Sequence, residues 1–216
     1  ICKSVGLSKS TVHRTMATME KRGYLSQSLE NGKYRLGVKT LSAGKAFLAG
    51  LDFRALALPY MRTIRDTINE SVNLYVTNGS KRVVIERLES DEPLRRVLKI
   101  GDELPLDRGA AGKVFLAFSP NLQEFAQIDP AIMAEIRRQH YAVSHGERES
   151  DAASVAVPLF DHQAKIIAVL AVSGPTIRFK EPQLSSYISI LRESSEAISN
   201  ALGCSPARLN ALRVAG

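Results

Sequence analysis

The 216-residue sequence has no tryptophan and only two cysteines, Cys2 and Cys204. The cysteines lie near opposite ends of the chain, outside any Cys-x-x-Cys pair or His-rich stretch, so neither a disulfide nor a metal framework is expected. No apolar run approaches the roughly 18 residues that a membrane helix needs, and no signal peptide pattern is visible. These absences predict a cytoplasmic protein with reduced thiols and no membrane partner. Because the chain begins with Ile1, we expect further residues upstream.

Signatures of catalysis are also missing. The sequence has neither a Gly-x-Ser-x-Gly nucleophile elbow nor a plausible Cys-His pair. The segment 108–113 superficially resembles a phosphate-binding loop, but Asp107 and Val114 stand where that motif requires Gly and Ser or Thr. No catalytic residue and no cofactor are predicted.

One acidic and His-containing stretch has the composition of a metal site. Its candidate ligands are His140, His145, Glu147, Glu149 and Asp151. Zinc prefers His and Cys at fixed spacing, whereas Gly146 and the mixed charges are typical of a solvated turn, so no metal is predicted. Arg148, between two Glu residues, is either a gate over a pocket or half of an exposed ion pair.

Positive charge is concentrated in the first quarter of the chain. The formal net charge is +7, and residues 1–50 contain nine Lys or Arg residues against Glu20 and Glu30 only. The rest of the chain is therefore neutral. Such asymmetry is typical of a segment that binds a polyanion, attached to a neutral body.

The basic segment has the pattern of a helix-turn-helix followed by a β-hairpin. Ser8 is a suitable N-cap for a helix over residues 9–21, and Gly23 ends it. Val12, Met16 and Met19 are spaced to form a buried stripe. The Asn31-Gly32 pair then favours a hairpin turn between strands near residues 24–26 and 33–36.

A helix of this kind fits the DNA major groove, where its N-terminal side chains reach base edges and phosphates. We therefore predict DNA contacts from the first two turns of the helix and from the hairpin. The predicted DNA-binding residues are Ser8, Lys9, Ser10, Thr11, His13, Arg14, Lys33 and Arg35. The alternative is a solvated basic helix.

The remainder of the chain alternates between strand and helix patterns. A linker helix, a second helix from about residue 54, and an antiparallel sheet flanked by helices are expected, which is an α+β fold. Strands are predicted at 72–76, 82–87, 94–100, 154–160 and 165–173. Helices are predicted at 111–118, 122–127, 131–139 and 181–202.

Small residues at 109–112 precede one of these helices. They either leave backbone N–H groups open to a carboxylate at the positive end of the helix dipole, or let the helix pack closely on the sheet. The residues alone do not decide between the two.

Four separated motifs, in order along nearly the whole chain, resemble the IclR-type bacterial transcriptional regulators. They are LSKSTVHRTMATMEKRGYL at 7–25, YRLG at 34–37, LPLDRGAAGK at 104–113 and VSGP at 172–175. The resemblance implies a winged helix-turn-helix domain over 1–37, a linker helix over 38–52 and a GAF-like effector-binding domain over 53–216. The family's first helix would lie upstream of Ile1, so the DNA-binding domain is expected to be incomplete.

The resemblance also implies that the backbone at Ala110 and Ala111 receives the carboxylate of a small organic acid. Ser144 and Ser154 replace an acidic residue and a Cys found in relatives that bind two- or three-carbon keto acids, and Ala171 replaces a Ser. Together with two nearby arginines, these changes favour a larger acid, whether aromatic, sugar or keto. The implied effector-binding residues are Arg96, Leu104, Arg108, Gly109, Ala110, Ala111, Ser144, Ser154 and Ser173.

The sequence thus predicts a regulator that binds double-stranded operator DNA as a homodimer or dimer of dimers, with affinity modulated by the acid. The alternative is an enzyme or small-molecule carrier whose basic head binds a partner.

Overall fold

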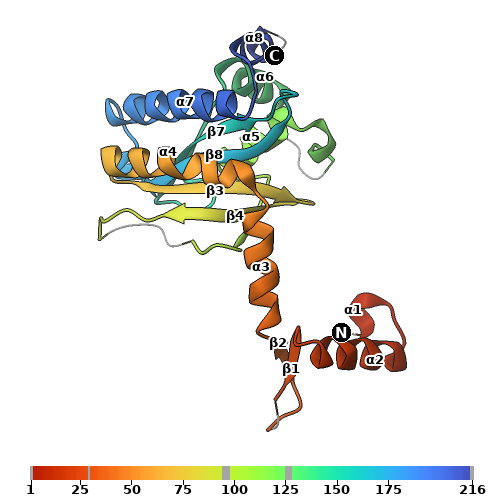
Figure 1. Ribbon diagram of the computed structural model, residues 1–216. Coiled ribbons are helices and arrows are strands. Elements are labelled where there is room, and N and C mark those ends of the chain that lie inside the picture. Colours follow the sequence, from red (N-terminus) through yellow and green to blue (C-terminus); the bar gives the residue numbers. More distant parts are fainter. Residues whose placement is uncertain (1, 29, 94–97, 125–127, 215–216) are drawn as a thin grey trace. The chain divides into compact units, whose positions relative to one another are not determined.

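The computed structural model describes residues 2–28, 30–93, 98–124 and 128–214. The chain divides into two compact units, unit 1 over residues 1–52 and unit 2 over residues 53–216. Figure 1 shows the helices and strands of both units. No helix in the described ranges combines the length and apolar character needed to cross a membrane.

Unit 1 contains the predicted helix-turn-helix and hairpin. Its elements are α1 (Cys2–Val5), α2 (Lys9–Lys21), β1 (Leu25–Gln27), β2 (Tyr34–Leu36) and α3 (Lys39–Ala49). The Ser8 hydroxyl accepts a hydrogen bond from the Thr11 N–H at 3.2 Å, which caps α2. After α2, Gly23 has a φ of +79°, and the Tyr24 N–H donates to the Met19 carbonyl. This left-handed residue ends the helix as expected.

The hairpin is fixed at both ends. At its tip the Asn31 side chain accepts from the Lys33 N–H at 3.0 Å, and Gly32 has a φ of +65°. At its base the Gly37 N–H donates to the Tyr24 carbonyl, and a Cβ at Gly37 would lie 2.3 Å from the Gly23 carbonyl oxygen. Glycine at position 37 therefore lets β2 leave the hairpin beside the end of α2.

The predicted buried stripe of α2 is only partly correct. Val12 is buried and Met16 half-buried, whereas Met19 is 41% exposed. The periodicity identified the apolar face, but the described part of unit 1 leaves Met19 partly uncovered. The neighbouring apolar residues Val5 and Leu7 are exposed as well.

Unit 2 is built on a six-stranded antiparallel sheet with the order β5-β4-β3-β8-β7-β6. The strands are β3 (Ser71–Asn78), β4 (Lys81–Leu88), β5 (Glu103–Pro105), β6 (Ala142–His145), β7 (Ala152–Phe160) and β8 (Ile166–Pro175). The helices are α4 (Asp52–Ile68), α5 (Ala110–Phe118), α6 (Pro130–Gln139), α7 (Gln183–Ala201) and α8 (Pro206–Val214), with short 3-10 turns at Pro120–Leu122 and Thr176–Arg178. The α+β prediction is confirmed.

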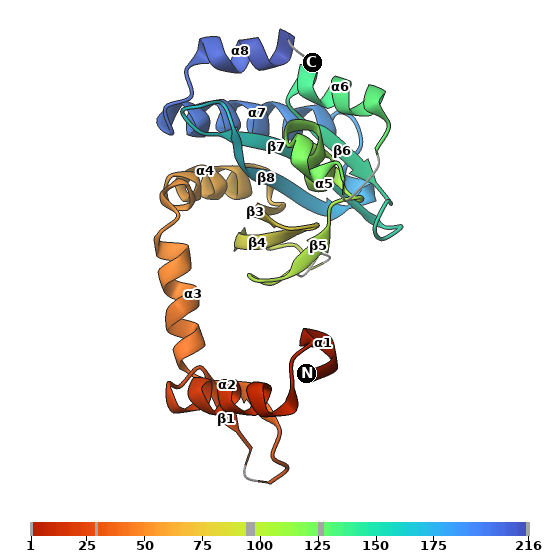
Figure 2. The same cartoon turned by 90° about the vertical axis from the view of Figure 1, so that its right-hand side faces the viewer.

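Helices cover both faces of this sheet (Figures 1 and 2). Helices α4 and α7 lie on one face and bury Met61, Ile64 and Leu191 there. Helix α5 lies on the other face, α6 packs on α5, and α8 packs on α6. The short helix α5, apolar along most of its length, is thus pressed between the sheet and a second helix layer.

Several predicted boundaries differ from the structure. No strand forms at residues 98–100, because the Asp102 carboxylate accepts from the Lys99 N–H and Gly101 takes a positive φ, which makes a turn. The strand is β5 instead, and residues 94–97 of the predicted strand lie outside the described ranges. The helix predicted at 122–127 is reduced to the 3-10 turn before residues 125–127, which also lie outside them. Strand β6 and helix α8 were not predicted.

Candidate functional site

The predicted DNA-binding side chains of unit 1 lie at its surface. Lys9, His13 and Arg14 are exposed along the first turns of α2. The small hydroxyl residues also form the cap, since the Ser8 Oγ lies 2.8 Å from the Thr11 Oγ1 and 3.0 Å from the Ser10 Oγ. A hydroxyl can donate and accept at once, so these residues combine capping with an outward polar surface.

The hairpin adds two further exposed cations, Lys33 and Arg35. The Arg35 Nε donates to the Ser26 hydroxyl at 3.0 Å, which holds the base of the guanidinium against the neighbouring strand and leaves its other N–H groups pointing outward. Glu20, an acidic residue of this segment, accepts from the Gln27 N–H at 3.1 Å. Its charge thus joins helix to hairpin while the cations stay exposed.

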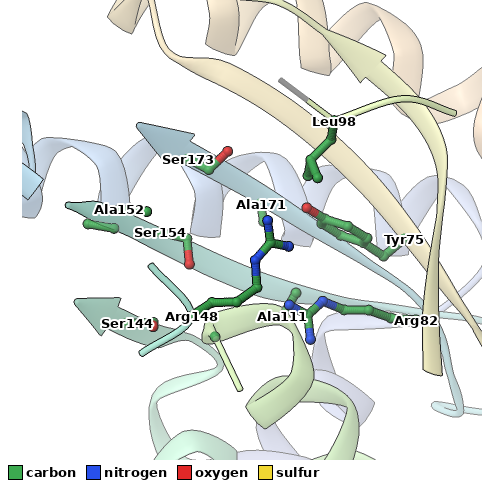
Figure 3. Close-up of a pocket in the computed structure, with 12 residues that line it drawn as sticks. Tyr75, Arg82, Leu98, Ala111, Ser144, Arg148, Ala152, Ser154, Ala171 and Ser173 are labelled. Atoms are coloured by element: carbon green, nitrogen blue, oxygen red, sulfur yellow. The ribbon is translucent and has the colours of Figure 1, made fainter. Parts of the chain in front are cut away.

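Unit 2 contains a small cavity, lined by both polar and apolar side chains, on the α5 face of the sheet, shown in Figure 3. Its volume is about 30 Å³, an order of magnitude below the ~300 Å³ of small ligand pockets. The cavity is lined by Tyr75, Arg82, Leu98, Gly109, Ala111, Ser144, Arg148, Ala152, Ala153, Ser154, Ala171 and Ser173. The Arg148 guanidinium extends into its centre, toward Ala171 and Tyr75 (Figure 3).

A row of serines crosses the sheet beneath this cavity. Ser144 pairs with Ser154, Ser154 with Ser173, and Ser173 with Ser71, on four neighbouring strands. Because directly paired residues point to the same face, their hydroxyls form one polar stripe. Small side chains along such a stripe leave room above the sheet and offer both donors and acceptors.

The polar stripe continues into a buried network. The Asn73 amide donates to the Ser173 hydroxyl at 3.1 Å, and the Arg87 guanidinium donates to the Asn73 side-chain oxygen at 2.9 Å. Nearby, the Glu70 carboxylate receives two hydrogen bonds from Arg178, which raise the pKa of Arg178. The Asn73 amide, itself held by Arg87, thus fixes the orientation of the Ser173 hydroxyl.

The start of α5 is held against the sheet by Arg82. Its guanidinium donates to the carbonyls of Pro105 and Arg108 and lies 5.7 Å from the Tyr75 ring centre. A Cβ at Gly112 would lie 2.1 Å from the Leu106 carbonyl oxygen, so only glycine permits this approach. The close-packing explanation therefore accounts for Gly112.

A carboxylate already lies at the N-terminus of α5. The Glu147 carboxylate accepts from the Gly109 N–H at 2.9 Å and forms an ion pair with the Lys113 ammonium. Partial burial disfavours its charged form, but the hydrogen bonds from Lys113, Gly109 and Ser144 and the charge of Lys113 outweigh burial and lower the pKa of Glu147. This helix terminus thus accommodates a carboxylate.

The structure brings together most of the predicted effector-binding residues. Gly109, Ala111, Ser144, Ser154 and Ser173 line the cavity. Ala110 and Leu104 are buried but do not line it, and the side chain of Arg108 is 59% exposed beside Asp107. The remaining predicted residue, Arg96, lies outside the described ranges.

Sequence reasoning missed several lining residues. One of them is Tyr75, which lies on the same face of β3 as Asn73, the partner of Ser173. The spacing of two residues between these side chains was the available signal. Arg82 gave no signal, because its partners are backbone carbonyls distant in sequence. Arg148 lines the cavity, and its Nη2 lies 3.0 Å from the Glu149 carboxylate, so an ion pair forms with Arg148 partly buried; the gate remains a prediction.

The two histidines of the acidic stretch at 140–151, which has the composition of a metal site, have separate partners in the structure. The His145 ring nitrogen lies 3.0 Å from the Phe179 carbonyl oxygen, and the His140 ring packs against Phe118 and Phe160. Among the residues that the structure describes, no three His, Cys, Asp or Glu side chains are grouped to hold a metal ion.

Comparison with known proteins identifies the family. The profile of the bacterial transcriptional regulator IclR C-terminal domain matches residues 45–200, and that of the IclR helix-turn-helix domain matches residues 1–29. The chain belongs to the IclR family. As its relatives are DNA-binding transcriptional regulators, the alternative of an enzyme is not supported.

Two relatives from Escherichia coli are similar over most of their length. The HTH-type transcriptional regulator XynR is 31% identical over 94% of this chain and 88% of its own, and KdgR is 31% identical over 94% and 84%. Among solved structures, the Thermotoga maritima IclR is 27% identical with a TM-score of 0.71, covering 94% of this chain and 89% of its own. An IclR family regulator from Brucella abortus is 27% identical with a TM-score of 0.76, covering 93% and 82%.

Proposed function

We propose that this IclR-family regulator binds its operator through α2 and the hairpin of unit 1, and that a small organic acid bound in unit 2 changes its affinity for DNA. The observation that carries the effector assignment is the start of α5, where a backbone N–H, a lysine and a serine converge on a carboxylate beside a serine-lined cavity. Helix N-termini favour anions because their first N–H groups lack partners within the helix.

The proposed DNA contacts follow from exposure and charge. Lys9 and Arg14 neutralise phosphates or reach base edges from the first turns of α2, and Lys33 and Arg35 extend the phosphate contact along the hairpin. The flanking hydroxyls of Ser8, Ser10 and Thr11 and the His13 ring supply further donors. In this arrangement α2 is the recognition helix and the hairpin is the wing.

Two copies of the chain, as a dimer or a dimer of dimers, would place two recognition helices in successive major grooves of a pseudo-palindromic operator. An apolar surface suited to self-association lies on unit 1, where Leu36, Val38, Leu41 and Phe47 are each more than half exposed. Exposed apolar side chains grouped along one segment are typical of protein interfaces.

An acid alters DNA affinity only if it binds the DNA-competent and DNA-incompetent arrangements unequally. We assign the connection to α3, because this helix directly follows the hairpin and leads into α4 of unit 2. A shift of the α5 face on acid binding would then change how two recognition helices are spaced.

The test combines acid binding with DNA binding in the full-length protein. A panel of short keto acids, sugar acids and aromatic acids is screened by thermal shift, and each hit is added to the protein on duplex DNA from upstream of its gene, measured by fluorescence anisotropy. We expect at least one acid to raise the melting temperature and to change DNA affinity.

Ala111→Leu should remove both responses to the acid, because the larger side chain enters the cavity. Ala117→Leu is the matched control, since Ala117 is equally buried in α5 but does not line the cavity. Loss of the acid response in both variants, or in neither, would place the acid elsewhere.

A further inference from the structure

The turn between β6 and β7 brings an acidic side chain and a basic one into the pocket region from adjacent positions. Glu147 caps the start of α5, and Arg148 lines the cavity beside it, with its guanidinium pointing inward. The turn itself is short, with the Gly146 N–H donating to the Ala152 carbonyl at 2.8 Å. Because the two residues are adjacent in this short turn, a displacement of the turn would move both.

The groups that hold Glu147 are those that a bound acid would need. The Gly109 N–H and the Lys113 ammonium donate to the Glu147 carboxylate, and the nearby Ser144 hydroxyl helps to lower the pKa of Glu147. Gly109 and Ser144 also line the cavity. A carboxylate arriving from solution and the Glu147 carboxylate would thus compete for the same donors.

The cavity volume supports the same conclusion. At about 30 Å³ the space left between the lining side chains, Arg148 among them, is two to three times the ~10–15 Å³ that one water molecule needs. Arg148 thus takes up room beside the start of α5 that a larger acid would need. The Arg148 guanidinium points toward Ala171, so its departure would enlarge this space, and the side chain of its neighbour Glu147 is one-third exposed.

We propose that Glu147 is a built-in competitor of the effector: its carboxylate occupies the effector's carboxylate position at the start of α5, and the acid binds by displacing the Glu147–Arg148 turn. This inference rests on the proposed function, because it specifies how the same site is regulated. The Glu147–Arg148 turn thereby lowers the affinity for the acid, since the observed affinity equals the intrinsic affinity multiplied by the fraction of molecules whose site is open.

Acetate is the probe, as the smallest stable carboxylate with a methyl tail. The ¹⁵N-labelled wild-type protein, Glu147→Ala and Glu147→Gln are titrated with sodium acetate at constant ionic strength, and the Gly109 amide signal is followed by NMR. Glu135→Ala is the matched control, because Glu135 is also paired with a cation but lies on α6.

We expect acetate to bind Glu147→Ala at least about tenfold more tightly than wild type, with the Gly109 amide signal returning toward its wild-type position as acetate replaces the missing carboxylate. Glu147→Gln should show a smaller gain in the same direction, because its amide keeps the shape but loses the charge. If Glu147→Ala does not fold, the acetate affinity of Glu147→Gln relative to wild type is the test of the proposal. Lys113→Met combined with Glu147→Gln should abolish the gain.

Equal acetate affinity in wild type and Glu147→Gln, or a gain that leaves the Gly109 signal unchanged, would overturn the proposal. The acetate result is independent of DNA. If acetate replaces Glu147 but no acid changes DNA affinity, the competition is real and the proposed effector function fails. If an acid changes DNA affinity equally in wild type and Glu147→Gln, the function stands and the competitor role is wrong.

Discussion

The two units use their charges in opposite ways. In residues 1–50 nine basic residues face two acidic ones, and the cations of α2 and the hairpin are exposed. In unit 2 the functional charges are turned inward, where Arg82 supports the start of α5 and Glu147 pairs with Lys113. A long polyanion requires an outward array of cations, whereas a small acid requires donors collected around one enclosed point.

The strongest test of this contrast is the loss of two outward cations. Lys9→Ala combined with Arg14→Ala should weaken DNA binding by roughly tenfold to a hundredfold at physiological salt and reduce the slope of log affinity against log salt by about 0.9 per lost phosphate contact. Fluorescence anisotropy across a salt series measures both quantities.

The control for this pair is Lys81→Ala combined with Arg138→Ala, which removes two exposed cations from unit 2. An equal loss of affinity in both double variants would mean that net charge, rather than the surface of α2, governs DNA binding.

Unit 1 was largely predictable because its signals are local. The Ser8 cap, the Gly23 stop and the Asn31-Gly32 turn each act within a few residues of one another. The error at Met19 has the same origin: periodicity identifies an apolar face but says nothing about what covers it. Packing partners are not a local property of a sequence.

Unit 2 was predictable in class but less so in its site. The serine row requires the pairing register of four strands, and register between distant strands is not evident in the sequence. The family resemblance supplied Ser144, Ser154 and Ser173, yet not Arg82, whose partners are backbone carbonyls more than 20 residues away. Arg108 was predicted to bind the effector because of its charge and position. Its side chain is exposed beside Asp107, and its backbone carbonyl accepts a hydrogen bond from Arg82.

Gly112→Ala tests how tightly the start of α5 is enclosed. In an open helix this change is stabilising by about 0.5–1 kcal/mol, but here the new Cβ would lie 2.1 Å from the Leu106 carbonyl oxygen. We expect a loss of about 1–3 kcal/mol in the free energy of unfolding of unit 2, from overpacking. Urea denaturation measures it, and a stabilised variant would mean that this approach is not required.

The ion pair of Glu147 gives a pH-dependent effect. Because the pKa of Glu147 is lowered in the folded protein, its ionised form contributes stability above the ordinary value of 4.5, and the contribution is lost as the pH falls through the lower folded value. The stability advantage of wild type over Glu147→Gln should therefore be present near neutrality and shrink below about pH 4.5. Lys113, His145 and Arg148, which face or neighbour Glu147, are common to both proteins.

Urea denaturation of both proteins over a pH series measures this difference. Glu135→Gln, which breaks an exposed pair with Arg138, is the control and should change stability little. A difference between wild type and Glu147→Gln that stays constant across the series would show that the charge of Glu147 is not what the α5 terminus recognises.

The smallest expected effect is Gly44→Ala, the same substitution placed in unit 1. Apart from its chain neighbours and the adjacent backbone of the helix itself, nothing in the described structure lies within 4 Å of a Cβ at Gly44, in the middle of α3. The variant should gain about 0.5–1 kcal/mol in helix stability through lower unfolded-state entropy, measured by urea denaturation followed at far-ultraviolet wavelengths. A gain in stability from Gly44→Ala together with a loss from Gly112→Ala would show that α3 is open at Gly44 and that α5 is enclosed at Gly112. A destabilised Gly44→Ala variant would instead mean that this face of α3 is covered in solution, and the second copy proposed for DNA binding would then be the first candidate for what covers it.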